Sequence, residues 1–229
     1  MCSGGTGGGP GGQGVAVSVG GAICNRGGAL QRCVGSLMEP GMLAAGIEVV
    51  VVLDGSIDGS REMLAGLPHS NALVVVEQEN LGAAAARNAG AHAACGTILL
   101  FLDDDLVCAP GLALGHLAAH AKGEATVVFG QMRSAVSAGR QALAEQEDPD
   151  SLDDHYARLE RNPQTRWPED AWIGPNCSIR RDIFLDCGGF DAGRFPRRME
   201  EPGFGRRLCG QGSVFRIGHR QVTGDTGVR

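Results

Sequence analysis

Hydrophobic residues along the chain alternate between short continuous runs and longer segments with helical spacing. The runs are rich in Val, Ile and Leu, which is typical of strands covered on both faces. The longer segments place apolar residues three or four positions apart, as Leu30, Cys33, Val34 and Leu37 do, which is the spacing of one helix face. Strands and helices in alternation predict a parallel sheet flanked by helices.

The predicted elements follow one another with short connections. We expect strands over residues 15–19, 47–53, 72–77, 97–102 and 126–131, and helices over residues 27–37, 60–67, 83–95 and 111–121. A helix or a mobile segment is expected over 152–160. The stretch 138–169 is polar and poor in β-branched residues, which favours a loop or flap near a substrate. The predicted fold class is α/β, with a single mostly parallel sheet.

Glycine dominates residues 1–14. Because such a composition buries little apolar surface and loses much entropy on ordering, we expect a disordered leader there. The remaining residues 15–229 suffice for one domain with a core but are few for two. We therefore expect a single domain after the leader.

Charge and hydropathy exclude several classes of partner. The 229 residues include 26 acidic and 20 basic ones, a formal net charge of −6, with no long run of Lys or Arg suited to nucleic acid. No apolar stretch approaches the roughly 20 residues of a membrane-spanning helix. The first residues lack the basic start and apolar core of a signal peptide. We expect a cytoplasmic protein that neither binds nucleic acid nor spans a membrane.

The eight cysteines are scattered, with no CxxC pair and no His at zinc-ligand spacing. This spacing predicts no disulfide framework. We interpret the cysteines as small reduced residues of the core, with a reactive thiol as the alternative.

Two polar segments follow predicted strands in the first half. Asp54 begins an Asp-Gly-Ser-Ile-Asp-Gly turn, after which Ser60 is placed to cap the next helix. The alanine-rich segment 80–90 carries Arg87. A plain β-to-α turn and a packed helix with a solvated Arg87 would explain both. Ligand binding is favoured because loops at the carboxyl ends of parallel strands line the binding crevice of open α/β sheets.

Three consecutive carboxylates, Asp103, Asp104 and Asp105, follow the predicted strand 97–102. Like charges repel one another unless a cation compensates them. Hard carboxylate oxygens suit Mg²⁺ or Mn²⁺, which bridge to substrate phosphates in many sites. The segment therefore predicts a metal site, with a solvated acidic turn as the alternative.

The second half offers candidates for acid–base chemistry. Trp172 would either stack on a ligand or pack in the core, and Asn176 follows it closely. A carboxylate far in sequence from the acidic turn, such as Glu200 or Glu201, can act as a general base on an acceptor hydroxyl. A helix N-terminal charge is the alternative role for either glutamate.

In this order, these segments resemble a family 2 glycosyltransferase of the GT-A fold, over roughly residues 15–208. The resemblance rests on the Asn-Arg pair after the first strand, the Asp-Gly-Ser turn, the helix Arg, the acidic strand end, the Gly-Pro-Asn and Gly-Gly-Phe-Asp segments and the paired glutamates. The sequence departs from the family pattern at Leu53 and Glu201, where the family has Asp, and at Gly203, where relatives often carry an acid.

The resemblance implies a role for each segment. The residues implied to contact the nucleotide are Asn25, Asp54, Arg87, Asp103 and Asp104. Those implied to hold Mg²⁺ or Mn²⁺ are Asp105 and Asp103, with Asp225 or His219 as a further ligand. Glu201, with Glu200 beside it, is implied to be the catalytic base. Residues implied to lie at the donor or acceptor sugar are Asn176, Trp172 and Asp191.

The implied reaction is a single displacement with inversion at the anomeric carbon of a nucleotide-diphosphate sugar. A UDP-sugar is the favoured donor, and the acceptor is a glycan, a lipid, a peptide or a small molecule. Residues 15–110 would form the nucleotide-binding half of the domain and residues 111–229 the acceptor-binding half. A non-catalytic sugar-nucleotide-binding or scaffold protein and a nucleotidyltransferase remain as alternatives.

Overall fold

The structure, a computed structural model, describes residues 15–19, 27–38, 46–67, 73–121, 127–130, 133–134, 176–194, 200–210, 215–217 and 224–226. Its strands are β1 (Val15–Val19), β2 (Glu48–Asp54), β3 (Leu73–Gln78), β4 (Ile98–Leu102), β5 (Leu106–Cys108), β6 (Val127–Phe129), β7 (Arg133–Ser134), β8 (Cys177–Arg180), β9 (Phe215–Ile217) and β10 (Gly224–Thr226). Its helices are α1 (Gly27–Leu37), α3 (Ser60–Ala65), α4 (Ala83–Ala93), α5 (Leu112–Ala121), α8 (Arg181–Asp186) and α9 (Glu200–Gly210).

The main sheet contains seven of the described strands in the order β3-β2-β1-β4-β8-β6-β9. Strands β3, β2, β1 and β4 are mutually parallel, whereas β8 pairs antiparallel with both β4 and β6. Val19 in β1 lies opposite Val51 in β2 and Leu102 in β4. The carboxyl ends of these three strands therefore lie at one edge of the sheet. Asp54 is the last residue of β2 and Asp103 directly follows β4 at this edge.

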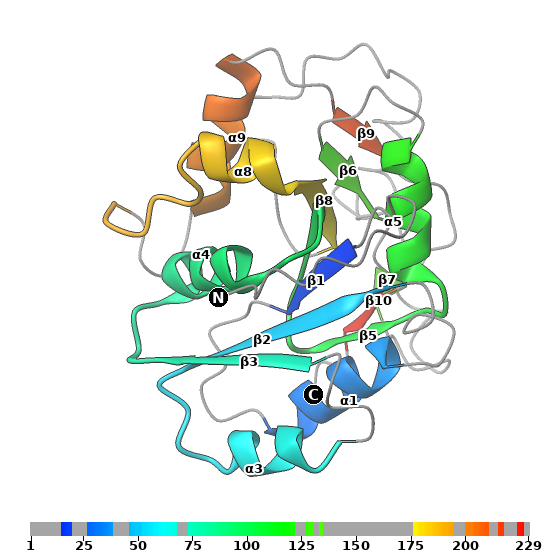
Figure 1. The fold of residues 1–229 in the computed structure, drawn as a ribbon, viewed down its shortest axis with the longest axis vertical. Coiled ribbons are helices and arrows are strands. Elements are labelled where there is room, and N and C mark those ends of the chain that lie inside the picture. The colour runs from blue at the N-terminus through cyan, green and yellow to red at the C-terminus, as the bar shows by residue number, and fades with distance from the viewer. Residues whose placement is uncertain are drawn as a thin grey trace, which may run out of the picture.

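Both faces of this sheet are covered by helices, and Figure 1 shows α4 on one side of β2 and β3 and α1 with α3 on the other. Alternate residues of one strand enter different cores. Val49 and Val51 pack in a cluster with residues of α1 and α5, whereas Val50 packs with residues of α4, α8 and α9. This two-sided burial explains why the strand is apolar at successive positions.

A second, smaller sheet has the order β5-β10-β7 among the described strands. Strand β10 runs antiparallel to β5 and parallel to β7. The sequence predicted a mostly parallel main sheet and did not predict this addition, because strands of two or three residues leave almost no pattern of hydrophobic alternation.

The predicted elements of the first half are confirmed to within a few residues. The helix expected over 27–37 has those bounds, and the strand expected over 47–53 is Glu48–Asp54. The helices expected over 83–95 and 60–67 both end two residues earlier than predicted. The leader 1–14 and the segments 138–169 and 152–160 lie outside the described residues.

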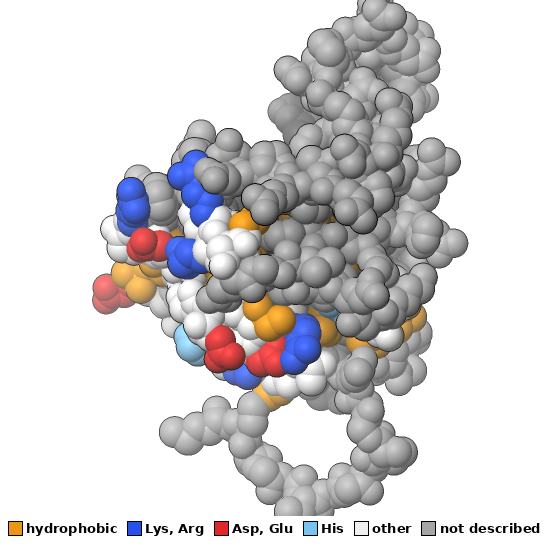
Figure 2. Space-filling view, turned by 90° about the horizontal axis from the view of Figure 1, so that it is seen from above, with side chains coloured by type: hydrophobic (Ala, Val, Ile, Leu, Met, Phe, Trp, Pro, Cys, Tyr) orange, Lys and Arg blue, Asp and Glu red, His pale blue; other side chains and the backbone are white. Residues whose placement is uncertain are grey.

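No helix in the part of the chain that the structure describes is long and apolar enough to cross a membrane. On the face shown in Figure 2, acidic and basic side chains of the described residues lie next to one another. The described residues also include exposed ion pairs, such as that of Arg180 with Asp182.

Among the described residues, the cysteines differ from the expectation at one position. Cys33, Cys108, Cys177, Cys187 and Cys209 have reduced thiols, as expected, but Cys95 is disulfide-bonded. The prediction of a reduced thiol is therefore wrong for Cys95. Sequence spacing could not indicate this, because a disulfide depends on distances in the folded chain.

Candidate functional site

The carboxylate of Asp54, the last residue of β2, is fully buried. Its Oδ1 accepts hydrogen bonds from Gln78 Nε2 at 2.7 Å and the Leu81 amide at 2.8 Å, and its Oδ2 accepts one from the Gly82 amide at 2.9 Å. These donors belong to the end of β3 and to the turn that begins α4. Asp54 thus fixes the start of α4 against the end of β2.

Gly55 keeps this turn tight. Its φ of 73° lies in the left-handed region that favours glycine, and its amide donates to the carbonyl of Gln78 at 2.8 Å. A Cβ at this position would lie 2.9 Å from Cβ of Asn80. The Asp-Gly sequence after β2 is therefore required by the close approach of two loops at the sheet edge.

Asp58, on the same loop, joins α1 to α3. Its Oδ2 accepts a hydrogen bond from the Gly27 amide at 3.1 Å, and its Oδ1 accepts from the amide and the hydroxyl of Ser60. The hydrogen bond from the Ser60 hydroxyl is the main cause that lowers the pKa of Asp58. The prediction that Ser60 caps α3 is wrong, because Ser60 is the first helical residue, the N-cap is Gly59, and the Ser60 amide donates to Asp58.

Arg87 of α4 lies 6% exposed and forms an ion pair with Asp103, with 3.0 Å between Nη2 and Oδ1. Its guanidinium carbon also lies 5.8 Å from the ring centre of Phe190. The alternative that Arg87 is solvated is therefore excluded. Alanines at the neighbouring buried positions let the helix approach the sheet closely enough for this pair to form.

The acidic turn after β4 contains carboxylates in different environments. The side chain of Asp103 is 33% exposed, Asp104 is buried at 6% exposure, and Asp105 is half-buried. The Leu106 amide donates to the Asp103 carbonyl at 3.3 Å, which closes the turn before β5. The turn therefore holds Asp103 against Arg87 and places Asp105 on the side that solvent reaches.

Strand β10 brings Asp225 close to this turn in the backbone. Asp225 lies opposite Val107 of β5 and opposite Arg133 of β7. Val107 is only two residues after Asp105. The pairing of β10 with β5 therefore brings the backbones of Asp105 and Asp225 near each other, and the resemblance assigns both residues to the metal. Carboxylates at these positions fit a hard divalent cation. Among the described residues, no three side chains of His, Cys, Asp or Glu converge as a complete metal cluster.

Two buried thiols lie behind the acidic turn. The Cys33 thiol of α1 donates to the Asp103 carbonyl at 3.5 Å and also interacts with Cys108 at the end of β5. This contact with Cys108, together with burial, raises the pKa of Cys33, so its thiol stays protonated. The pair packs the turn against α1.

Asn176 precedes β8 and connects the ends of three strands. Its amide donates to the carbonyl of Phe101 in β4 at 2.9 Å, and its carbonyl accepts from the Gly130 amide, after β6, at 2.8 Å. Its φ of 63° is in the left-handed region, which Asn tolerates better than most residues. The side chain is 1% exposed. Asn176 therefore lies beside the strand end that carries Asp103, with its side chain directed into the interior.

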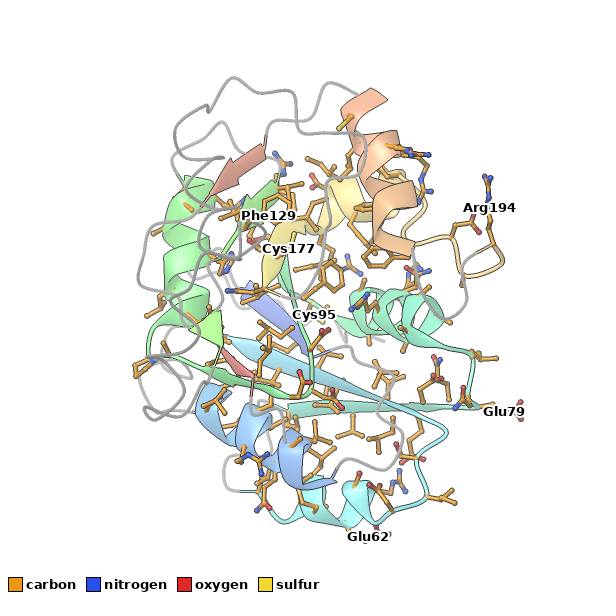
Figure 3. The ribbon with its side chains drawn as sticks, turned by 180° about the vertical axis from the view of Figure 1, so that it is seen from behind. Glu62, Glu79, Cys95, Phe129, Cys177 and Arg194 are labelled. Carbon is orange, nitrogen blue, oxygen red and sulfur yellow. The ribbon has the colours of Figure 1, made fainter. Side chains whose placement is uncertain are left out.

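The Gly-Gly-Phe-Asp segment is held against α4 by Asn88. The Asn88 side chain donates to the Phe190 carbonyl at 2.8 Å and accepts from the Phe190 amide at 2.9 Å. A Cβ at Gly189 would lie 2.6 Å from Asn88 Oδ1. After this segment, Asp191 accepts a hydrogen bond from the Arg194 amide at 2.9 Å, and Arg194 projects outward in Figure 3.

An aromatic cluster anchors α9, the helix that begins at Glu200. Phe204 of α9 packs against Phe184 and Phe190 with ring centres 5.0 and 5.2 Å apart, and Phe184 in turn contacts Phe101 of β4. The first turn of α9 therefore projects from a rigid base. The structure gives the backbone of Glu200, Glu201 and Asp225 without describing their side chains, and Asn25, Trp172 and His219 lie outside the described residues.

The family model of "Glycosyl transferase family 2" matches residues 18–188, well over half of the chain. The chain belongs to glycosyl transferase family 2. This match confirms the resemblance that the order of the motifs indicated.

Relatives and solved structures of glycosyltransferases agree with this family. Validoxylamine A glucosyltransferase from Streptomyces hygroscopicus subsp. jinggangensis is 38% identical over 109 residues, which are 46% of this chain and 26% of that protein. A Pyrobaculum calidifontis mannosyltransferase, solved with GDP-Man and Mn²⁺, has a TM-score of 0.67 at 19% identity over 94% of this chain and 56% of that one. S. aureus TarS 1–349, solved with UDP-GlcNAc, has a TM-score of 0.63 at 17% identity over 94% and 59%.

These structures confirm that the chain has the GT-A fold. The chain spans about a quarter of the length of the curated relative and somewhat more than half of each solved structure.

Several residues that build the site had no role predicted from the sequence. Asp58, Gln78 and Asn88 bind backbone or side-chain groups across the sheet edge. Asp58 and Asn88 were visible inside motifs but had no assigned role. The long-range partners of Asp58, Gln78 and Asn88 lie 24 to 102 positions away in the sequence. The periodicity of a sequence does not reveal such contacts.

Proposed function

We propose that the protein transfers a sugar from a nucleotide-diphosphate sugar to an acceptor hydroxyl, with inversion at the anomeric carbon and with a divalent cation. The observation that carries the proposal is the ion pair between Arg87 and Asp103. It joins two segments, 16 positions apart, that the family resemblance assigns separately to the nucleotide. Their contact at the carboxyl edge of β4 supports one shared donor site there.

The nucleotide would lie over the carboxyl ends of β1, β2 and β4, within the half formed by residues 15–110. The Asp54 carboxylate is buried and accepts hydrogen bonds from backbone amides. We therefore infer that Asp54 contributes to binding of the nucleotide base indirectly, by positioning the turn before α4. Arg87 acts similarly on Asp103, because a fixed carboxylate loses less entropy when a ligand binds.

The residues that would hold Mg²⁺ or Mn²⁺ are Asp105 and Asp103, with Asp225 brought near by β10. A cation bound there would neutralise the charge that develops on the departing diphosphate. The chain contributes an arrangement in which Asp103 is already oriented by Arg87 and Asp105 is partly open to solvent.

The proton of the acceptor hydroxyl would pass to Glu201 in the first turn of α9. Glutamate is one methylene longer than the family's usual aspartate, and a base must lie within hydrogen-bond reach of the proton that it takes. The packing of Phe204 on the aromatic cluster fixes the helix that carries this base. We infer that residues 111–229 supply the acceptor side.

The test is the release of nucleoside diphosphate from a panel of UDP-, GDP- and dTDP-sugars, with Mn²⁺, with Mg²⁺ and with a chelator. The panel is broad because the similar solved structures carry UDP-GlcNAc in one case and GDP-Man in another. We expect slow, metal-dependent hydrolysis of one donor class, with a UDP-sugar favoured. Nucleotide binding without turnover under any condition would instead identify a non-catalytic sugar-nucleotide-binding protein.

A further inference from the structure

A buried chain of polar side chains connects α5 to the start of β8. Nδ1 of His116 lies 2.7 Å from Ser178 Oγ, and its Nε2 lies 3.0 Å from Asn176 Oδ1. Nε2 of His120, one turn later on α5, lies 2.9 Å from the same Ser178 hydroxyl. His116, Asn176 and Ser178 are each at most 2% exposed. Buried polar groups in such a chain stabilise one arrangement when their donors and acceptors match.

The contacts and the neutral state of His116 together give the direction of these three hydrogen bonds. Asn176 Oδ1 can only accept, so Nε2 of His116 carries the hydrogen. Burial lowers the pKa of His116 to about 4, so the ring is neutral at pH 7 and its Nδ1 accepts from the Ser178 hydroxyl. Ser178 in turn accepts from His120 Nε2. The donors therefore run from His120 through Ser178 and His116 to Asn176.

Asn176, the last member of this chain of polar side chains, is held tightly at the sheet. A Cβ at Gly130 would lie 2.4 Å from Asn176 Nδ2. The Asn176 side chain therefore occupies the space that a side chain at position 130 would need. The next residue, Cys177, lies opposite Phe129 between β8 and β6, and Figure 3 shows the two side by side. The Asn176 amide is bonded to Phe101, two residues before Asp103. A shift of Asn176 would therefore reach the acidic turn directly.

We propose that His116 is a positioning residue of the transferase site, which acts by holding the Asn176 side chain and thereby the adjoining ends of β4 and β8. The proposal rests on the proposed function for its effect on turnover. It adds a residue on α5 that acts through Asn176, whose Oδ1 fixes the His116 tautomer, while the Ser178 hydroxyl donates to the other ring nitrogen.

The first test compares His116→Leu with His116→Gln. Leucine keeps much of the side-chain volume but removes both ring nitrogens, whereas the glutamine amide retains one donor and one acceptor. We expect His116→Leu to lower kcat about tenfold, because small displacements of reacting groups are costly, while the KM for the donor changes less than about threefold. Glutamine should restore most of kcat. A loss confined to KM, or an equal loss in both variants, would overturn the proposal.

A second comparison separates positioning from general loosening of α5. Leu112→Ala removes a buried residue of α5 outside the polar chain, and we expect kcat within about twofold of wild type despite a lower Tm. Asn176→Gly removes the side chain at a φ that glycine tolerates. In that background, His116→Leu should lower kcat less than about twofold further. Losses that multiply, or a Leu112→Ala loss as large as that of His116→Leu, would contradict the assigned route through Asn176.

A readout without turnover completes the test. Ring ¹⁵N chemical shifts of the wild-type chain at pH 7 should report His116 as neutral with hydrogen on Nε2, and the opposite tautomer or a charged ring would refute the arrangement. The His116→Leu and Asn176→Gly changes in Tm should also be non-additive. If no donor is turned over, the proposed function fails on its own, while the tautomer and the Tm coupling still decide whether His116 holds Asn176.

Discussion

Two polar regions meet at the carboxyl end of β4, and they differ in charge and in access to solvent. The acidic turn carries Asp103, with a side chain 33% exposed, and the half-buried Asp105. The chain of polar side chains on α5 is 2% exposed at His116, whose ring is neutral at pH 7. The first region keeps charge where a ligand can reach it. In the second region, both ring nitrogens of His116 have hydrogen-bond partners within the chain of polar side chains.

The difference separates two uses of polar residues at one sheet edge. A carboxylate that awaits a cation must retain access to solvent, because removing it from water without a partner is costly. A residue that only positions another can be buried, provided that its hydrogen bonds are complete. Arg87 belongs to the charged region but is also buried, with 6% exposure against at most 2% for His116, Asn176 and Ser178. If burial and charge divide function in this way, substitutions in the two regions should have different effects.

The largest expected effect is on catalysis at the charged region. Glu201→Gln removes the proposed base but keeps the length of the side chain, so we expect kcat to fall about 10²- to 10⁴-fold with an unchanged Tm. Steady-state kinetics with the donor found in the panel and calorimetry measure the two quantities. Glu200→Gln is the matched control, and an equal loss in that variant would remove the assignment to Glu201.

The next effect is on stability at the neutral region. The pKa of His116 is lowered from 6.5 to about 4 by burial, so the unfolded chain binds more protons between these values. Stability should therefore be full above pH 6.5 and fall as the pH drops toward 4, by about 3 kcal/mol from this group alone. Urea unfolding of wild type and His116→Gln across this range measures the difference. His120 is present in both proteins, so an identical pH slope would contradict a buried neutral His116.

Arg87→Leu sharpens the comparison because it removes a buried charge from the charged region. We expect a loss of about 2 kcal/mol in the free energy of unfolding, reduced from the value for a fully buried pair because Asp103 is one-third exposed. Arg61→Leu is the control, since its ion pair with Glu77 is exposed and should contribute less than about 0.5 kcal/mol. Equal losses in the two variants would show that burial of Arg87 has no special effect.

The smallest effect is expected at Asp58, which is exposed and binds backbone groups of α1 and α3. Asp58→Ala should lower Tm by about 2 °C, and Asp58→Asn by less, since the amide oxygen can still accept. The pKa of Asp58 is lowered in the folded chain, so its contribution is present above the unfolded pKa and is lost as the pH falls through the folded one. A difference between wild type and Asp58→Ala that persists unchanged in strong acid would contradict this role.

The sequence predicted elements best where burial is two-sided or periodic. Strand β2 and helix α1 were found because their apolar residues repeat at the spacing of buried elements. Strands β5 and β10 were missed, since their pairing depends on residues more than 100 positions apart. Their short length left no pattern to read.

The candidate site divides in the same way. The acidic turn and Arg87 were predicted from residue type and motif order, and the structure joins them in an ion pair. The role of His116 was not predicted, because a histidine within an apolar helix pattern gives no indication of Ser178 and Asn176, which are 62 and 60 positions away. The disulfide at Cys95 was missed for the same reason.

The central claim is that Asp105 couples a divalent cation to binding of a nucleotide-diphosphate sugar. Calorimetric titration of the donor into wild type, Asp105→Asn and Asp186→Asn, each with Mn²⁺ and with a chelator, tests it directly. Asp186 is an exposed carboxylate at the end of α8 and serves as the control. We predict that Mn²⁺ tightens donor binding at least about tenfold in wild type and in Asp186→Asn but has no effect in Asp105→Asn. The same Mn²⁺ dependence in all three proteins would contradict the claim.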